Sequence, residues 1–293
     1  MILGQYSFRF FTINFIWLCQ PFIFILGKSP LLYAAEHSYR PEDSGVSFEQ
    51  ILELPSSPSD YEIYYGLELL QFGQLWLPKR GSYGTVIFVH GGCWMNEYDI
   101  DHTKAFASAL ASSGYAVWSL EYRRTGDPGG AWPGTFEDVI LGINKLADLE
   151  GYDINMDKVA LMGHSAGGHL AVLAGVRPEL LKVKPTVVIG LAAITDLKAY
   201  AKGENSCQKA TIEFMNGSPD ERPSAFENAQ PGNFEVVYNT ILFYGGADQI
   251  VPSSQASLSG ATGLRHESAG HFDWIHPGTS AFQEILSVLS KEL

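Results

Sequence analysis

The run Gly-His-Ser-Ala-Gly at 163–167 has the residue types and spacing needed for a nucleophilic serine. It follows the apolar run Val159–Met162 and leads into the helix-like run His169–Ala174. A strand, a sharp turn with a central serine and a helix form the context in which G-x-S-x-G marks a nucleophile. The flanking residues must be small because such a turn strains the backbone and brings neighbouring chains close. We therefore predict that Ser165 is a nucleophile at a helix N-terminus, where N–H groups favour negative charge; the alternative is an ordinary turn.

A serine hydroxyl needs a base to take its proton and an acid to orient that base. Asp248 lies in a glycine-rich loop after the strand-like run 240–244, and we predict that it is the acid. The alternative reading of Asp248 is a turn aspartate, which is common next to glycine. Asp196, which follows the strand-like run 187–191, is the rival acid and ranks below Asp248.

His271 lies in a loop of small residues between a strand-like segment at 264–267 and the last helix, and we predict that it is the general base. His276, which precedes Pro277, is its rival. The remaining histidines have other expected roles. His164 and His169 pack against or cap the turn at Ser165, and His90 belongs to a second, glycine-containing loop at 90–94 that is expected to bind the oxyanion. The last three are expected to be solvated: His37, His102 and His266.

A second glycine motif lies upstream of the serine. The apolar run Val86–Val89 reads as a buried parallel strand and leads into His90-Gly91-Gly92-Cys93-Trp94. Glycines at this place let backbone N–H groups approach a tetrahedral oxyanion, a task shared with the residue after the nucleophile. We predict that the N–H groups of Gly91 or Gly92, together with that of Ala166, form an oxyanion hole.

Six stretches of the chain carry a resemblance to a known family: His90–Trp94, Glu121–Arg124, Trp132–Asp138, Gly163–Leu170, Gly245–Pro252 and Gly270–Pro277. The chain resembles α/β-hydrolases of the esterase/lipase group with an HGG oxyanion loop. Within that group it is similar to small carboxylesterases, including the kynurenine formamidase-like and the bacterial carbohydrate- or feruloyl-esterase-like branches. The resemblance implies an α/β-hydrolase fold, with a mostly parallel central sheet covered by helices on both faces, and a triad of Ser165, Asp248 and His271.

The resemblance also implies an activity, the hydrolysis of a small-molecule carboxylic ester through an acyl-enzyme. An amidase or peptidase, arylformamidase-like or prolyl-peptidase-like, would use the same triad, and a hydrolase fold that only binds is a further alternative. No cofactor is implied. The chain has no CxxC pair and no HExxH motif, so we expect no metal site.

The order of apolar runs predicts the elements that position these residues. We expect an edge strand at 67–77, strands at 85–90, 116–121, 158–163, 186–192, 239–244 and 264–268, and helices at 102–113, 135–149, 166–176, 207–215, 253–260 and 279–291. Such alternation implies one parallel α/β domain, here 67–293, after a polar lead-in at 36–66. In the helix 135–149, Phe136, Val139, Ile140, Ile143, Leu146 and Ala147 form a core stripe. Glu137, Asp138, Lys145 and Asp148 are expected to face outward.

A substrate pocket is expected in the loops at the carboxyl ends of the strands. Aromatic residues gather there, and we predict that Trp94, Tyr98, Trp132 and Trp274 bind substrate, with packing as the alternative. Arg123 and Arg124 could bind a carboxylate but more often such residues pair with an internal acid such as Glu121. The segment 196–236 is expected to form a small cap.

The N-terminus has a different composition from the rest of the 293 residues. Residues 1–35 hold two basic and no acidic residues, and 10–26 is almost wholly apolar, which indicates a signal sequence or an uncleaved membrane anchor. We therefore expect an exported protein, periplasmic or secreted, whose one route to membrane attachment is this segment. The net charge is −13, and −15 without residues 1–35, which argues against nucleic acid as a partner.

Export leaves two cysteines, Cys93 and Cys207. An oxidising compartment permits a disulfide between them, which would tether the segment around Cys207 over the active site. Two separate, half-buried thiols are the alternative.

Overall fold

The computed structural model describes residues 1, 39 and 44–293. Apart from Met1, the segment predicted as a signal sequence or anchor lies outside the described residues. Within the described part of the chain, no helix combines the length and the apolar character needed to cross a bilayer.

An eight-stranded sheet forms the centre of the domain, in the order β1-β2-β4-β3-β5-β6-β7-β8. The strands are β1 (Tyr61–Tyr64), β2 (Phe72–Trp76), β3 (Thr85–Val89), β4 (Ala116–Leu120), β5 (Val159–His164), β6 (Val187–Leu191), β7 (Asn239–Gly245) and β8 (Thr262–His266). The first two pairings, β1 with β2 and β2 with β4, are antiparallel, and the remaining five are parallel. The carboxyl ends of six parallel strands therefore lie along one edge, where the predicted catalytic loops begin.

Helices cover both faces of this sheet, as expected for an α/β-hydrolase. They are α1 (Phe48–Leu52), α2 (Lys104–Ser112), α3 (Gly134–Lys145), α4 (Ala166–Gly175), α5 (Leu197–Tyr200), α6 (Ser206–Phe214), α7 (Pro223–Ala229) and α8 (Ser280–Glu292). Single 3-10 turns lie at Ile100–Thr103, Leu146–Asp148, Pro178–Leu180, Pro231–Asn233, Ser253–Ala256 and Asp273–Ile275.

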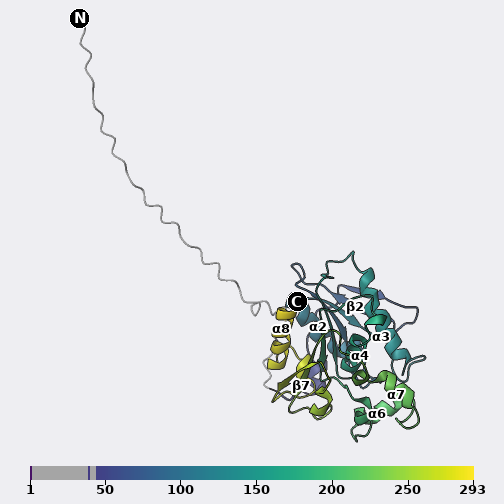
Figure 1. Cartoon of the computed structure of the whole chain (residues 1–293). Helices are drawn as coiled ribbons and strands as arrows, with labels where there is room; N and C mark the ends of the chain where they lie inside the picture. The colour runs from purple at the N-terminus through teal and green to yellow at the C-terminus, as the bar shows by residue number, and fades with distance from the viewer. Residues whose placement is uncertain (2–38, 40–43) are drawn as a thin grey trace. The chain divides into compact units, whose positions relative to one another are not determined.

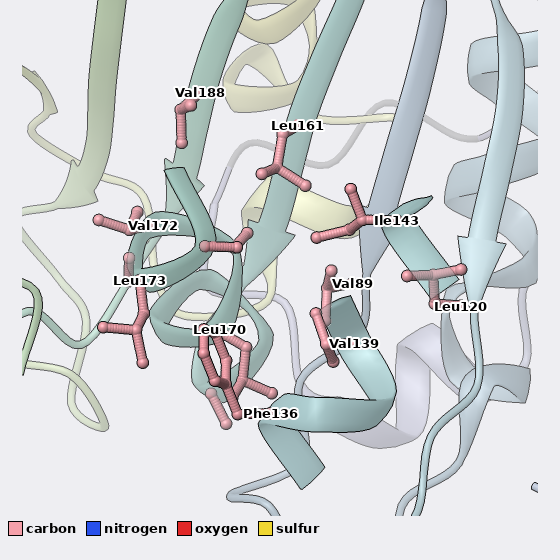
Figure 2. Close-up of a cluster of buried hydrophobic side chains, with 14 of the residues drawn as sticks. Val89, Leu120, Phe136, Val139, Ile143, Leu161, Leu170, Val172, Leu173 and Val188 are labelled. Carbon is pink, nitrogen blue, oxygen red and sulfur yellow. The ribbon is translucent and has the colours of Figure 1, made fainter. Parts of the chain in front are cut away.

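Two apolar cores lie on opposite faces of the sheet. One core packs α3 and α4 against the sheet; Figure 2 shows Val139 and Ile143 of α3 near Leu161 and Val89 of the central strands. The other core packs α2 and α8 against the opposite face. Strands β3 and β5 are buried along their whole length, which is why their sequences are continuous apolar runs rather than alternating ones.

The predicted cap segment, 196–236, folds into α5, α6 and α7, and Figure 1 shows α6 and α7 in green at one end of the sheet. Both contact α5. Phe214 and Phe226 of this segment join the core on the α4 side. All ten residues of α4 are buried, because the sheet covers one side of the helix and the cap covers another.

Three expectations about the elements are wrong in detail. The helix predicted at 253–260 is only a 3-10 turn at Ser253–Ala256, and the helix predicted to 149 ends as α3 at Lys145 and continues as a 3-10 turn. The sheet begins inside the predicted lead-in, because β1 pairs with β2 and takes the edge position expected for 67–77.

Asp138 of α3 was expected to face solvent, and this is wrong. Its carboxylate is fully buried and accepts hydrogen bonds from Arg123 at 2.6 and 2.8 Å and from Gln71 at 2.6 Å. A charge in an apolar stripe is tolerated when it is paired and hydrogen-bonded in this way. The sequence pattern of α3 contains no sign of those partners, which come from other elements.

Candidate active site

Ser165 lies at the sharp turn between β5 and α4. Its backbone has φ 55° and ψ −121°, a left-handed region that a side chain rarely adopts. The glycines on either side are required because neighbouring backbone comes close. A Cβ added at Gly163 would lie 2.2 Å from the carbonyl oxygen of Gly167. A Cβ added at Gly167 would lie 2.1 Å from the carbonyl oxygen of His90. The turn is thus a strained strand-to-helix elbow in direct backbone contact with the predicted oxyanion loop.

The predicted oxyanion loop, 90–94, lies beside Ser165. A Cβ added at Gly91 would lie 3.1 Å from the Cβ of Ser165, and one added at Gly92, where φ is +106°, would lie 2.3 Å from the Cβ of Tyr98. Gly92 therefore needs glycine, and Gly91 leaves little room for a side chain. Ala166 opens α4, so its N–H group has no partner within the helix. Of the three predicted donor residues, the structure places Gly91 beside Ser165 and Ala166 directly after it, and Gly92 follows Gly91 in the loop.

His90 anchors this loop to the end of β4. Its Nδ1 lies 2.8 Å from the carbonyl oxygen of Gly91, and its Nε2 lies 3.1 Å from Oε1 of Glu121. Arg124 lies 3.3 Å from the same Glu121 oxygen, so Arg124 pairs with an internal acid. Burial acts to raise the pKa of Glu121, but His90 and Arg124 beside it bring the pKa below its usual value. The loop that carries Gly91 is thus held by a buried charged network.

Asp248 and His271 come from the loops after β7 and β8 and lie in contact. The Nδ1 atom of His271 is 2.8 Å from Oδ2 of Asp248, and both side chains are almost completely buried. A carboxylate only accepts hydrogen bonds, so Nδ1 carries the proton and Nε2 is the basic nitrogen. The other oxygen of Asp248 accepts from the N–H groups of Ile250 and Val251 at 2.8 and 2.9 Å. This arrangement fixes the orientation of the Asp248 carboxylate as well as that of the His271 ring.

His164 links the loop of His271 to the turn at Ser165. Its Nε2 lies 2.9 Å from the carbonyl oxygen of His271, and the centroids of the two imidazole rings are 4.7 Å apart. Burial, and then the neighbouring His271, lower the pKa of His164 well below its usual value, so its ring is neutral. The ring therefore donates through Nε2–H. The residue immediately before Ser165 thus holds the backbone of His271, which is more than the general packing role expected from the sequence.

The rival candidates lie elsewhere. Asp196 caps α5 by accepting from the N–H of Ala199 at 3.0 Å, and Nδ1 of His276 accepts from the N–H of Gly278 at 3.1 Å. His102 was expected to be solvated, and this is wrong: it is buried, and burial lowers its pKa to about 3. His266 is also largely covered, with 15% of its side chain exposed.

The four aromatic residues predicted to bind substrate divide into two pairs. Trp94 and Trp274 are 0% exposed, so neither can touch a substrate in this structure. Trp94 stacks on Phe214 of the cap, and Trp274 packs against Phe243 in the other core. Both were expected in the pocket because they lie in or next to the predicted catalytic loops. Their large apolar area is instead buried in the two cores. Tyr98 and Trp132 remain half-buried.

The predicted lead-in, 36–66, reaches the same region, and no motif in it indicates this. The ring of Phe48 in α1 contacts that of Tyr98, with centroids 5.5 Å apart, and that of Phe272, next to His271, with centroids 5.4 Å apart. The N–H groups of Gly45 and Val46 donate to the carboxylate of Asp273 at 2.9 and 3.0 Å. The sequence signal was weak: only the capping box at Ser47 and Gln50 marks α1 as an ordered helix.

A disulfide joins Cys93 to Cys207, whose Cα atoms are 5.0 Å apart. The hypothesis of a disulfide is therefore confirmed, and the alternative of two separate thiols is wrong. In the part of the chain that the structure describes, no group of three or more His, Cys, Asp or Glu side chains is placed to hold a metal ion.

Comparisons with known proteins identify the family of the chain. The BD-FAE family model matches residues 74–260, more than half of the chain. Esterase LipC of Mycobacterium tuberculosis is 26% identical over 66% of this chain and 52% of its own length. Kynurenine formamidase of Meyerozyma guilliermondii is 26% identical over 53% of this chain and 63% of its own. The chain therefore spans between half and two-thirds of the length of these relatives.

Solved structures share the fold. Esterase B from Lactobacillus rhamnosis (HN001) superposes with a TM-score of 0.69 at 19% identity, covering 81% of this chain and 87% of its own. A truncated carbohydrate esterase from gut microbiota gives 0.66 at 21% identity, covering 87% and 99%. With the family model, these likenesses confirm the predicted α/β-hydrolase fold. The chain belongs to the BD-FAE family, within the α/β-hydrolase carboxylesterase group that carries an HGG oxyanion loop.

Proposed function

We propose that this protein is a serine hydrolase that cleaves a small-molecule carboxylic ester through an acyl-enzyme, with Ser165, His271 and Asp248 as its triad. The observation that carries the proposal is the 2.8 Å contact between Nδ1 of His271 and Oδ2 of Asp248, in a loop tied by His164 to the strained turn at Ser165. The esterases among its relatives and structural neighbours support the ester as the substrate class.

In this mechanism, Nε2 of His271 takes the proton of Ser165 as the hydroxyl attacks the ester carbonyl. The oxyanion of the tetrahedral intermediate is bound by the N–H of Gly91 or Gly92 and that of Ala166. His271 then gives its proton to the leaving alcohol, and the acyl group remains on Ser165. A water molecule activated by His271 releases the carboxylic acid. Asp248 holds the ring and stabilises the imidazolium in both half-reactions.

The test compares the full chain with Ser165→Ala, using the exposed Ser287→Ala as a matched control. With p-nitrophenyl acetate, we expect a burst and turnover in the parent and the control. In Ser165→Ala both should fall by up to about 10⁶-fold. A fluorophosphonate probe should label the parent and the control but not Ser165→Ala. Equal rates in all three proteins would mean that Ser165 is not the nucleophile, and a fold that only binds would become the better reading.

Amide hydrolysis is a second candidate, because a kynurenine formamidase is among the relatives. An enzyme acting on an amino acid derivative would benefit from a free arginine near the site. Arg123 pairs with Asp138 and Arg124 with Glu121, so neither presents an unpaired charge for a substrate carboxylate. This observation favours the ester. A higher kcat/KM for N-formylkynurenine than for aryl acetates would reverse the order.

We also propose that the protein is exported. The apolar run at 10–26 and the disulfide between Cys93 and Cys207 support this, because disulfides persist in oxidising compartments. Cell fractionation, with N-terminal sequencing of the recovered protein, tests it. Recovery of the chain only from the cytoplasm, with Met1 retained and both thiols free, would reject export.

A further inference from the structure

The bridge between Cys93 and Cys207 connects two parts of the proposed site that are 114 positions apart in the sequence. Cys93 follows the two oxyanion glycines, and Cys207 lies in the first turn of the cap helix α6. We propose that the pair is a positioning device for the oxyanion hole, so that reducing the bridge lowers kcat and leaves substrate affinity nearly unchanged. This inference rests on the function proposed above.

The backbone next to the bridge needs support from outside the loop. Three consecutive residues, Gly92, Cys93 and Trp94, have φ values of +106°, 53° and 58°. Only glycine adopts such angles without cost, because in other residues the Cβ approaches the neighbouring carbonyl oxygen. Two non-glycine residues in succession therefore persist only where surrounding contacts hold them.

Two of those contacts come from α6. The indole of Trp94 stacks on Phe214 with ring centroids 4.8 Å apart and planes 10° from parallel. The other non-glycine residue, Cys93, is bonded covalently to the same helix. The carbonyl oxygen of Trp94 accepts from Thr125 at 2.8 Å, which supports the loop from the β4 side. The disulfide thus holds Cys93, the strained residue that directly follows the two glycines of the proposed oxyanion hole.

The helix that carries the bridge is fixed at both ends. At its C-terminus, the carbonyl oxygen of Phe214 accepts from the N–H of Trp132 at 2.8 Å. At its N-terminus, Nδ2 of the capping residue Asn205 donates to the carbonyl oxygen of Ile250 at 2.9 Å. The N–H of Ile250 in turn donates to Asp248. A short series of bonds therefore links the oxyanion loop, through α6, to the loop of the triad acid.

Reduction has a defined chemical outcome. A dithiol reductant transfers two electrons and two protons to the bridge, which yields two thiols and the oxidised, cyclic form of the reductant. Cys93 can then leave its left-handed conformation and move the N–H groups of the preceding glycines. Oxyanion donors act in the transition state more than in substrate binding, so their displacement lowers kcat with little change in KM. Complete loss of one donor costs about 10²–10³ in kcat, which sets the upper limit.

The experiment compares the oxidised full chain, the same protein after dithiothreitol, and Cys93→Ser/Cys207→Ser. We expect kcat for p-nitrophenyl esters to fall at least tenfold in the last two, with KM within twofold. The affinity for a boronic acid, which bonds to a catalytic serine and places an oxygen in the oxyanion hole, should fall by the same factor as kcat. Dithiothreitol should not change the double variant further.

The matched control is Ile285→Val on α8, which removes one buried methylene-sized group from the core on the opposite face of the sheet. It should lower the melting temperature without changing kcat, which separates loss of stability from loss of positioning. The inference is overturned if the reduced chain keeps kcat within twofold, or if it loses activity only together with its circular dichroism signal. An oxidised parent without any esterase activity rejects the proposed function instead.

Discussion

The substitution Asp248→Asn tests the proposed triad through one proton. Oδ1 of Asp248 accepts from two backbone N–H groups, those of Ile250 and Val251, while Oδ2 faces Nδ1 of His271. In the asparagine variant, the amide oxygen must take the place of Oδ1, because an NH2 group there would face two donors. The amide nitrogen is therefore directed at the imidazole of His271.

This reversal changes the tautomer of the base. Nδ1 of His271 must now accept a hydrogen bond, so the ring proton moves to Nε2, the nitrogen that has to accept the proton of Ser165. The volume and the backbone bonds of residue 248 stay the same, so the fold should persist. A wrong tautomer in a triad of this kind lowers kcat by about 10⁴-fold, or about 5 kcal/mol of transition-state stabilisation.

The assay is steady-state hydrolysis of p-nitrophenyl acetate, with thermal unfolding to confirm the fold. Asp196→Asn is the matched control, because Asp196 is the rival acid and its side chain caps α5. Asparagine caps a helix as well as aspartate, so kcat should stay within twofold. A kcat of Asp248→Asn within tenfold of the parent would refute the reasoning. A large loss in Asp196→Asn alone would make Asp196 the acid.

Two further predictions concern buried histidines. His164→Gln keeps a donor for the carbonyl oxygen of His271, whereas His164→Met does not. In steady-state kinetics only the methionine variant should therefore lose kcat, by about fivefold, which corresponds to one net hydrogen bond. Its KM should stay constant. Burial lowers the pKa of His102 to about 3 and that of His169 to about 4, so their neutral forms stabilise the fold above pH 6.5. As the pH falls below 6.5, the unfolded chain binds protons that the folded chain does not, and stability declines until the folded pKa values are reached. Urea unfolding should show a loss of about 2 kcal/mol per histidine at pH 5 relative to pH 7.5, and equal stability at both pH values would contradict this.

The parts of the site that could be predicted from the sequence depend on local backbone geometry. A Cβ at Gly163, Gly167 or Gly92 would collide with neighbouring atoms. One at Gly91 would be tightly packed. Such demands act on residues close to one another in the chain, so they leave motifs that can be read directly. The strand-like runs around these motifs are equally local, and they predicted the central strands well.

The parts that could not be predicted depend on partners distant in the sequence. Asp138 reads as an outward residue until Arg123 and Gln71 are brought to it, and His102 reads as solvated until the fold covers it. Trp94 and Trp274 lie in or next to the predicted catalytic loops, yet each packs against an aromatic side chain in a core. Burial of a polar or aromatic side chain is a tertiary property, and neither periodicity nor motif spacing contains it.

The same distinction explains how the proposed site is held. Glycine motifs allow Ser165 and the oxyanion loop to come close, but glycine alone leaves a loop free to move. Three contacts from distant elements remove that freedom: His90 with Glu121, His164 with the carbonyl of His271, and Cys93 with Cys207. Oxyanion donors stabilise a transition state because their orientation is already set before reaction. The motifs therefore determine which groups lie close together, and the distant contacts determine how firmly those groups are held in place. Variants that remove one of the distant contacts should change kcat without changing the fold.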